Sequence, residues 1–195
     1  MTRPVRPPLP TRDGVSPSSV ALPSGPWTTV LDFLVERLPA VSRHEWRRRM
    51  ADGDVVDDQG RLVPPDAPYH PQSRLHYWRS LAFEHPIPFD EHIVFQDEHL
   101  VIADKPHFLP LTPKGRYVQE TLLVRLKRRL GIDTLVPMHR LDRETAGLVA
   151  FTVQPASRDA YQALFRERQV QKVYEALAPY RPELAGPLRR HSRLE

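Results

Sequence analysis

The chain has 195 residues, 40% of them hydrophobic and 27% charged, which is enough for one core of ordinary size plus a small accessory unit. It contains no cysteine, which excludes thiol nucleophiles, disulfides and thiolate zinc sites. Its formal net charge of +4 permits a polyanionic partner without requiring one.

Residues 1–26 are rich in proline and small polar residues. Such a segment buries too little apolar surface to offset the entropy lost on ordering, so a disordered arm is expected. The chain has no run of about 18 apolar residues and no signal-peptide core. No membrane partner and a cytoplasmic location are therefore expected.

Residues 27–80 are predicted to form a small helical module. Apolar residues recur at helical spacing over 30–38, and Ser42 and Glu45 fit a capping box that opens a second helix. A short hairpin and a strand-like run around residue 76 follow. The second helix carries a cluster of arginines: Arg43, Arg47, Arg48 and Arg49. Few acids lie near enough to neutralise this cluster, which favours a phosphate-facing patch over a solvated helix face.

Residues 81–195 are predicted to form a second domain after a proline-punctuated linker. The expected elements are a hairpin over 93–103, a helix over 119–130, a strand over 148–153, a helix over 157–168 and a strand over 170–177. The basic C-terminal half of the helix over 119–130 is explained equally by nucleic-acid contact and by the helix dipole.

Three histidines in this region do not form a metal site. His85, His92 and His99 are spaced seven residues apart, but Pro86 and Pro88 prevent one helix from carrying all three. No metal is therefore expected.

The stretch HRLDRETAGL, residues 139–148, has the richest chemistry in the chain. It lies between an apolar run over 135–138 and the strand predicted over 148–153. A strand, a charged turn and a strand can hold a carboxylate rigidly at the rim of a pocket. The alternative is a surface hairpin with solvated charges. A hydrolase that uses His139 is disfavoured, because the chain has no G-x-S-x-G elbow.

These residues resemble the HRLD-x-x-T-S/A-G-L motif of the RluA-type pseudouridine synthases. Residues 164–176 resemble a second motif of that family, which ends in a K-x-Y-x-A strand. Lys105-Pro106 is similar to the start of its catalytic domain, but Phe108 stands where the family usually has glycine, so a different loop path is expected. Residues 27–80 resemble the small RNA-binding module first described in a ribosomal small-subunit protein.

The resemblance implies an α+β fold with a mixed, largely antiparallel sheet flanked by helices, preceded by the small module. It implies isomerisation of uridine to pseudouridine in structured RNA, either rRNA or tRNA, by a protein that is monomeric at full length. The reaction oxidises nothing and transfers no group, so no cofactor is expected. Asp142 is the expected catalytic carboxylate, acting either as nucleophile at C1′ or as base at C2′.

Other residues receive roles from the same resemblance. Tyr174 is expected to stack on the uracil and to help remove the C5 proton, and Arg140 is expected to occupy the space of the flipped-out base. The expected RNA-binding residues are His139, Arg140, Arg143, Arg43, Arg47, Arg48 and Lys105. Gly147 is expected where backbone comes close.

One expected feature is missing from the sequence. The family's third motif, which supplies a basic partner for the catalytic aspartate, has no counterpart, so a C-terminally truncated catalytic domain is expected. The activity of the 195-residue chain is therefore left open. The alternative to an active enzyme is a catalytically inactive RNA-binding fragment.

Overall fold

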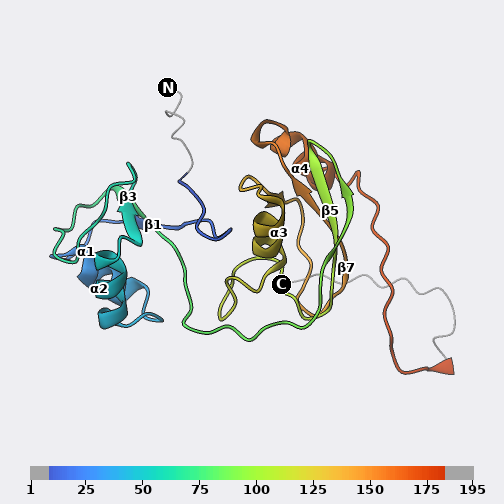
Figure 1. Cartoon of the computed structure of the whole chain (residues 1–195), viewed down its shortest axis with the longest axis horizontal. Helices are drawn as coiled ribbons and strands as arrows, with labels where there is room; N and C mark the ends of the chain where they lie inside the picture. Colours follow the sequence, from blue (N-terminus) through green and yellow to red (C-terminus); the bar gives the residue numbers. More distant parts are fainter. Residues whose placement is uncertain (1–8, 183–195) are drawn as a thin grey trace.

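The chain forms two units, each built on an antiparallel sheet. The computed structural model describes residues 9–182, and Figure 1 shows the units joined by a long connecting segment. The elements of the N-terminal unit are β1 (Ser18–Leu22), α1 (Val30–Arg37), α2 (Arg43–Ala51), β2 (Val55–Asp57) and β3 (Ser73–Tyr77). Those of the C-terminal unit are β4 (His92–Gln96), β5 (Leu100–Lys105), α3 (Leu122–Leu130), β6 (Val136–Pro137), β7 (Gly147–Thr152), the 3-10 helix η1 (Pro155–Ser157) and α4 (Arg158–Arg166).

The predicted α+β class is confirmed. All strand pairings within residues 9–182 are antiparallel, so the parallel pairs of a mixed sheet are not found in that range. No helix in the same range is both long and apolar enough to span a bilayer.

The helices of the N-terminal unit pack against a three-stranded sheet of order β1-β3-β2. Thr29 and Ser42 cap α1 and α2, since each hydroxyl accepts a hydrogen bond from the amide three residues on, at 3.1 and 3.2 Å. The predicted cap at Ser42 is thus confirmed. Side chains from both helices and from all three strands then close one core, which includes Phe33, Leu34, Trp46, Val55 and Leu75.

Strand β1 corrects the prediction that residues 1–26 are a disordered arm. It pairs with β3 along its whole length, from Ser18 opposite Tyr77 to Leu22 opposite Ser73. Leu22 is buried in the core of the unit. The strand is ordered because β3 satisfies its backbone groups and the core covers its apolar side chains, neither of which composition reveals. The N-terminal unit therefore begins before residue 27, and residues 1–8 lie outside the described range.

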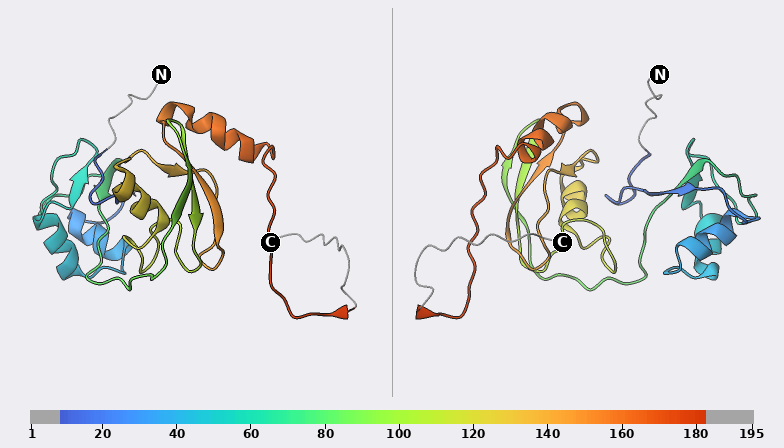
Figure 2. Two further views of the ribbon diagram at one scale, coloured as in Figure 1. Left: turned by 45° about the vertical axis from the view of Figure 1, so that its right-hand side comes forward. Right: turned by 180° about the vertical axis from the view of Figure 1, so that it is seen from behind.

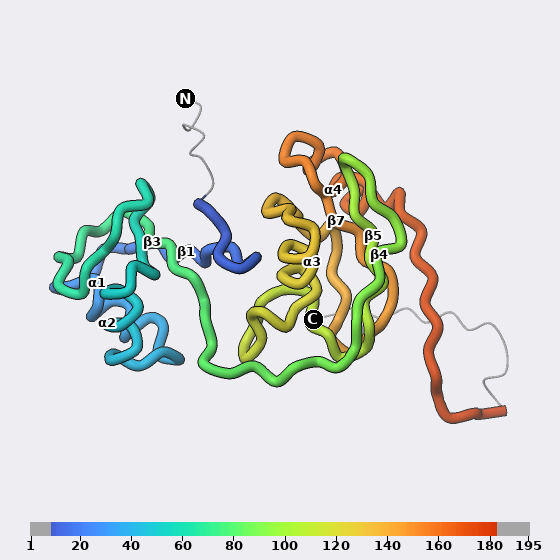
Figure 3. Tube along the Cα trace, viewed as in Figure 1, coloured from blue at the N-terminus to red at the C-terminus, as the bar shows by residue number. Residues whose placement is uncertain are grey.

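Residues 9–17 run between the two units and lie against α3 (Figures 2 and 3). Arg12 and Val15 exchange two backbone hydrogen bonds of 2.8 and 3.0 Å around Asp13 and Gly14. Both central residues have positive φ, 48° and 77°, as in a type I′ turn. Val15 is buried against Val118 and Val124, so this turn docks on the C-terminal unit.

Arg12 fastens the same segment to the N-terminal unit. Its guanidinium pairs with Asp54, donates to the Gly53 carbonyl at 3.0 Å and lies 3.9 Å from the centre of the Trp78 ring. The Trp78 indole in turn donates to the Pro10 carbonyl at 3.1 Å. One short segment is therefore bonded to both units.

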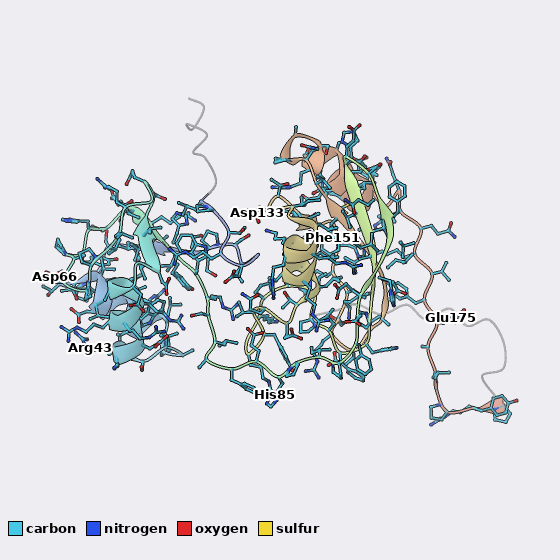
Figure 4. All side chains as sticks on the ribbon, in the orientation of Figure 1. Arg43, Asp66, His85, Asp133, Phe151 and Glu175 are labelled. Carbon is cyan, nitrogen blue, oxygen red and sulfur yellow. The ribbon has the colours of Figure 1, made fainter. Side chains whose placement is uncertain are left out.

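In the C-terminal unit, α3 packs on one face of a four-stranded sheet of order β4-β5-β7-β6. β5 and β7 form its centre, paired from Leu100 opposite Thr152 to Lys105 opposite Gly147. Alternate side chains of these strands are buried with those of α3 in a core that includes Val101, Ala103, Leu122, Leu126, Val149 and Phe151. Figure 4 shows Phe151 between the helix and the sheet.

Two of the basic residues of α3 have structural partners. Arg125 donates to the carbonyls of Ile87 and Phe89, at 2.9 and 2.8 Å, and pairs with Glu120. Lys127 is 4% exposed and donates to the Ser16 hydroxyl at 2.8 Å. These two residues are therefore used within the fold, through specific partners that neither expected explanation included.

The strand predicted over 170–177 is not formed. The chain from 171 to 181 has no helix or strand, and Val173 and Leu177 are 84% and 106% exposed. Apolar alternation yields a strand only where a neighbour accepts its hydrogen bonds, and no strand within residues 9–182 pairs with this segment. Figure 1 shows it running away from the sheet.

We expect Gly14→Ala to release residues 9–17 from α3. A Cβ at Gly14 would lie 2.9 Å from the Val124 carbonyl oxygen, and the φ of +77° is unfavourable for alanine. The left-handed conformation alone costs about 1–2 kcal/mol. Hydrogen exchange of the Val15 amide, which bonds to the Arg12 carbonyl, should therefore rise roughly tenfold or more.

Gly131→Ala is the matched control for Gly14→Ala. Gly131 also has a positive φ, +67°, but a Cβ there would meet nothing within 4 Å. It should leave Val15 exchange unchanged. Slow Val15 exchange in the Gly14→Ala variant would contradict the docking of this segment.

Candidate active site

Residues 138–146 form a charged turn between β6 and β7. Val136 and Pro137 pair with Thr152 and Phe151, and the Met138 amide extends the ladder by donating to the Ala150 carbonyl at 2.9 Å. Both sides of the turn are therefore anchored in the sheet. The predicted arrangement of strand, charged turn and strand is confirmed.

Gly147 closes this turn for a different reason than the sequence predicted. A Cβ there would meet nothing within 4 Å, so close approach of backbone is not the requirement. Its φ of +121° is the constraint, because side-chain-bearing residues rarely adopt that conformation.

The turn borders a hollow of about 600 Å³. One wall is the segment 137–143, which carries Asp142, and the other is the segment 110–114, which carries Lys114. Asp142 is exposed, and its carboxylate accepts no hydrogen bond and forms no ion pair with any residue of the described range. An unpartnered carboxylate thus lies at the rim of a concave surface.

Lys105 lies beneath the turn, which corrects the prediction that it contacts RNA. Its side chain is 0% exposed, and its ammonium donates to the carbonyls of Pro106, Leu109 and Arg143 at 3.0, 2.8 and 3.2 Å. Burial lowers the pKa of Lys105, while the charges of Glu144 and Asp142 oppose that shift. A lysine whose three donors are used in this way positions the turn instead of binding a phosphate.

His139 is tied to β7 and α4. Its Nε2 accepts a hydrogen bond from the Ala150 amide at 3.2 Å, and its ring stacks on Phe165 with centroids 5.0 Å apart. Because Nε2 accepts, the ring is neutral, with its proton on Nδ1 facing the Arg140 carbonyl. Burial lowers the pKa of His139, and the nearby charge of Lys172 adds to the shift. These contacts hold the His139 ring against β7 and α4.

The cations at the rim of the hollow are Lys114, Arg140 and Arg143. Arg143 pairs with Glu144 at 3.0 Å, whereas no ion pair joins Lys114 or Arg140 to an acid within residues 9–182. Sequence reasoning identified both arginines but missed Lys114. The only signal for Lys114 was a lysine beside glycine in a short polar segment, which is too common to single out a site.

Tyr174 lines a second hollow, of about 450 Å³, next to the first. The two hollows share His139 and Leu141, so the histidine that stacks on Phe165 stands between Asp142 and Tyr174. Tyr174 is 62% exposed, on a segment without regular structure. The structure therefore brings the two predicted catalytic residues to neighbouring surfaces and not into one pocket.

Ion pairs neutralise most of the arginine cluster on α2. Arg43 pairs with Asp32 at 2.7 Å, and Arg48 pairs with Glu45 and Asp52 at 2.8 and 2.9 Å. Hydrogen bonds from Arg48 and Arg49 lower the pKa of Glu45 to about 2.

Two other arginines of this cluster differ in their exposure to solvent. Arg49 is 7% exposed and is therefore not part of a surface patch. Arg47 is exposed and makes no ion pair within the described range. The strongly charged patch predicted from the sequence is thus reduced to Arg47 and to two exposed arginines that already have acidic partners.

Phe108 occupies a conformation that glycine favours. Its φ is +67°, so the loop after Pro106 adopts the left-handed backbone conformation here even without a glycine. The ring is 51% exposed and lies 6.4 Å from the ring of Phe89. The missing glycine was expected to change the path of the loop, but at this residue the backbone keeps a conformation that glycine favours.

No metal site stands out in the described residues. Within residues 9–182, no three histidine, cysteine, aspartate or glutamate side chains are grouped so as to hold a metal ion. The hollow combines the Asp142 carboxylate with several cationic side chains. This arrangement suits acid–base or nucleophilic catalysis on an anionic substrate.

Comparison with known proteins bears on these residues. Residues 99–193 match the family model described as RNA pseudouridylate synthase. An uncharacterized RNA pseudouridine synthase of Synechocystis is 33% identical over 148 residues, which are 76% of this chain and 50% of that protein. The tRNA pseudouridine(31) synthase of Saccharomyces cerevisiae is 38% identical over 84 residues, covering 43% of this chain and 20% of its own.

A solved structure is also similar in sequence. Human RNA Pseudouridylate Synthase Domain Containing 4 has 34% sequence identity and a TM-score of 0.33, covering 40% of this chain and 30% of that one. The chain spans half the length of the Synechocystis relative.

We expect the pH dependence of the turn to follow His139. Its folded-state pKa lies below 6.5, so the unfolded chain takes up the proton first as pH falls. The stability that this contact contributes is therefore present above about pH 6.5 and is lost progressively as pH falls below it. Protection of the Ala150 amide against exchange, corrected for the intrinsic rate, should decrease over that range.

His139→Gln provides the comparison, because glutamine keeps an oxygen acceptor and does not titrate. Its Ala150 protection should be independent of pH between 5 and 8. Identical pH profiles for the two proteins would show that His139 does not control the turn.

We also expect Phe108→Gly to be more stable than Phe108→Ala, by about 0.5–1 kcal/mol, because only glycine adopts positive φ without cost. Urea unfolding of both variants measures the difference. Phe89, whose φ is not positive, is the control position, and there alanine should be the more stable replacement. Equal stabilities at Phe108 would contradict the strained backbone.

Proposed function

We propose that this chain, whose residues 99–193 match the RNA pseudouridylate synthase family, isomerises uridine to pseudouridine in RNA, with Asp142 as the catalytic carboxylate. The predicted relationship to pseudouridine synthases is confirmed by the family match. Since the chain spans only half of its Synechocystis relative, the activity and substrates of the whole protein are part of this proposal.

The observation that carries the proposal is the Asp142 carboxylate, which has no partner among residues 9–182 and lines the same hollow as Lys114 and Arg140. The reaction breaks the bond between N1 and C1′ of uridine and forms one between C5 and C1′; the C5 proton leaves and N1 takes up a proton. A carboxylate contributes either as nucleophile at C1′ or as base at C2′. Both routes need a carboxylate oxygen that no other group occupies, and within residues 9–182 no group bonds the Asp142 carboxylate.

The target nucleotide must leave its stack before the carboxylate can reach it. Extrusion costs a few kcal/mol. Arg140, exposed and without an acidic partner in the described range, is suited to occupy the vacated space with its planar guanidinium. Tyr174 would stack on the uracil once segment 170–177 closes over the hollow that it shares with His139.

Both rRNA and tRNA remain candidate substrates, and the N-terminal unit is proposed to help bind them. A yeast relative acts, by its name, on tRNA. Arg47 on α2 makes no ion pair with any residue from 9 to 182. Arg43 and Arg48, at 60% and 51% side-chain exposure, have solvent-accessible ion pairs that a phosphate can replace.

A second candidate is an RNA-binding fragment without activity. It is favoured by the position of Tyr174, which is 62% exposed and does not line the hollow of Asp142. The two candidates differ in turnover and agree in RNA binding.

We expect Asp142→Asn to stop turnover while leaving RNA binding intact. An unmodified tRNA transcript containing 5-tritiated uridine releases tritium when C5 loses its proton. The variant should lower the release rate by about 100-fold or more, since asparagine is neither nucleophile nor base. Its affinity for the transcript should not fall, because the change removes a negative charge.

The result decides between the two candidates. Release by Asp142→Asn at the wild-type rate would remove Asp142 from the chemistry. Tight binding by the wild-type chain without any release would identify the inactive fragment.

A further inference from the structure

The second wall of the hollow is a short hairpin that carries two cations. Lys114 and Tyr117 exchange two backbone hydrogen bonds of 3.0 and 3.2 Å, with Gly115 at a φ of +57° between them. Lys114 and Arg116 are exposed, and neither forms an ion pair within the described residues. Only Lys114 lines the hollow that holds Asp142.

This hairpin is held by the segment that links the two units. Arg79 donates from Nη1 to the Pro113 carbonyl at 3.1 Å and from Nη2 to the Gly115 carbonyl at 2.9 Å. Its guanidinium therefore bonds the residues on either side of Lys114. Arg79 directly follows Trp78, whose indole bonds residue 10, so the contact starts at the edge of the N-terminal unit.

The other end of the hairpin is fixed by Glu84. Its carboxylate accepts hydrogen bonds from the amides of Val118, Gln119 and Glu120 at 2.8, 2.9 and 3.0 Å. Charge-assisted bonds of this kind are about twice as strong as those between neutral groups. With Arg79, the linker makes five side-chain bonds to the backbone of residues 113–120. A hairpin anchored in this way does not behave as a free surface loop.

We propose that Lys114 binds a phosphate of the RNA strand next to the target uridine, and that Arg79 is the positioning residue that holds Lys114 at the hollow. The proposal rests on the proposed function, because it takes RNA as the occupant of the hollow. A phosphate approaching the hollow is repelled by Asp142 and needs a cation on the opposite wall. Lys114 is the lysine that lines the hollow, and an ammonium on a flexible stem suits a phosphate whose exact position varies.

The placement of Arg79 links RNA binding by the N-terminal unit to the hollow. The residue stands at the exit from β3 and bonds the far wall of the hollow directly. Any shift of the N-terminal unit that moves the linker therefore moves Lys114. In this way the linker sets the distance between Lys114 and Asp142.

The first test is the salt dependence of binding to an unmodified tRNA transcript, measured by fluorescence anisotropy with the full chain. Loss of one phosphate contact reduces the slope of log affinity against log salt by about 0.7–0.9. Lys114→Gln should show that reduction, and Lys114→Arg should retain the wild-type slope. Arg116→Gln is the matched control, because it removes one exposed charge from the same hairpin outside the hollow and should change the slope less.

The second test addresses Arg79 through a double-mutant cycle. Arg79→Met should weaken binding in the wild type and add no further loss in the Lys114→Gln background, because its effect acts through Lys114. In turnover assays, both Lys114→Gln and Arg79→Met should raise KM and leave kcat within about twofold. The reason is that a contact to a phosphate, which does not react, is made equally in the ground state and the transition state. A merely structural loss would lower kcat and the melting temperature as well.

The outcomes separate this inference from the proposed function. An unchanged salt slope and KM in Lys114→Gln, or equal slope changes in Lys114→Gln and Arg116→Gln, would overturn the role of Lys114 even if Asp142→Asn abolishes turnover. Additive losses in the cycle would overturn the role of Arg79. A wild-type chain that binds the transcript and releases no tritium would refute the proposed activity, while the salt slope would still support or refute the contact of Lys114.

Discussion

The buried ammonium of Lys105 is the contact on which the candidate site depends. It lies at the end of β5, where the strand pairs with the start of β7, and it bonds the carbonyls of Pro106, Leu109 and Arg143. A buried charge is stable only when its donors are satisfied, so these three carbonyls must stay in place together. One side chain thereby fixes the loop after β5 and the charged turn before β7 relative to each other.

That constraint explains why Asp142 has no partner among the residues that the structure describes. Lys105 satisfies the backbone of the turn from below, His139 ties the turn to Ala150, and Arg143 pairs with its own neighbour Glu144. The groups that hold the turn in place therefore do not use the Asp142 carboxylate. A side chain held by its backbone and not by its own polar atoms is available to a ligand.

The two units are connected more firmly than a proline-punctuated linker implies. Residues 9–17 bond both units, Arg79 bonds the hairpin around Lys114, and Glu84 accepts three amides before α3. Hydrogen bonds between charged side chains and backbone groups hold the linker to the C-terminal unit more strongly than exposed ion pairs do. If such a bond breaks, the buried backbone group loses its partner and must be hydrated again. The N-terminal unit and the hollow are therefore mechanically coupled through residues that look unremarkable in the sequence.

The sequence by itself determined what depends on neighbours along the chain: the helix capped by Ser42, the hairpin of β4 and β5, and the charged turn between two strands with Asp142 in it. The cap that the sequence favours at Ser157 is not formed, because its side chain does not bond the start of α4. The tertiary structure alone decided how each charge is used. It ordered β1 against β3, and it left segment 170–177 without a partner strand among residues 9–182. It buried Lys105 and Arg49, paired Arg43 and Arg48 with acids, and brought Lys114 and Asp142 to the same hollow. The reason is physical: periodicity and caps are local, whereas burial and ion pairing depend on distances that only the folded chain sets.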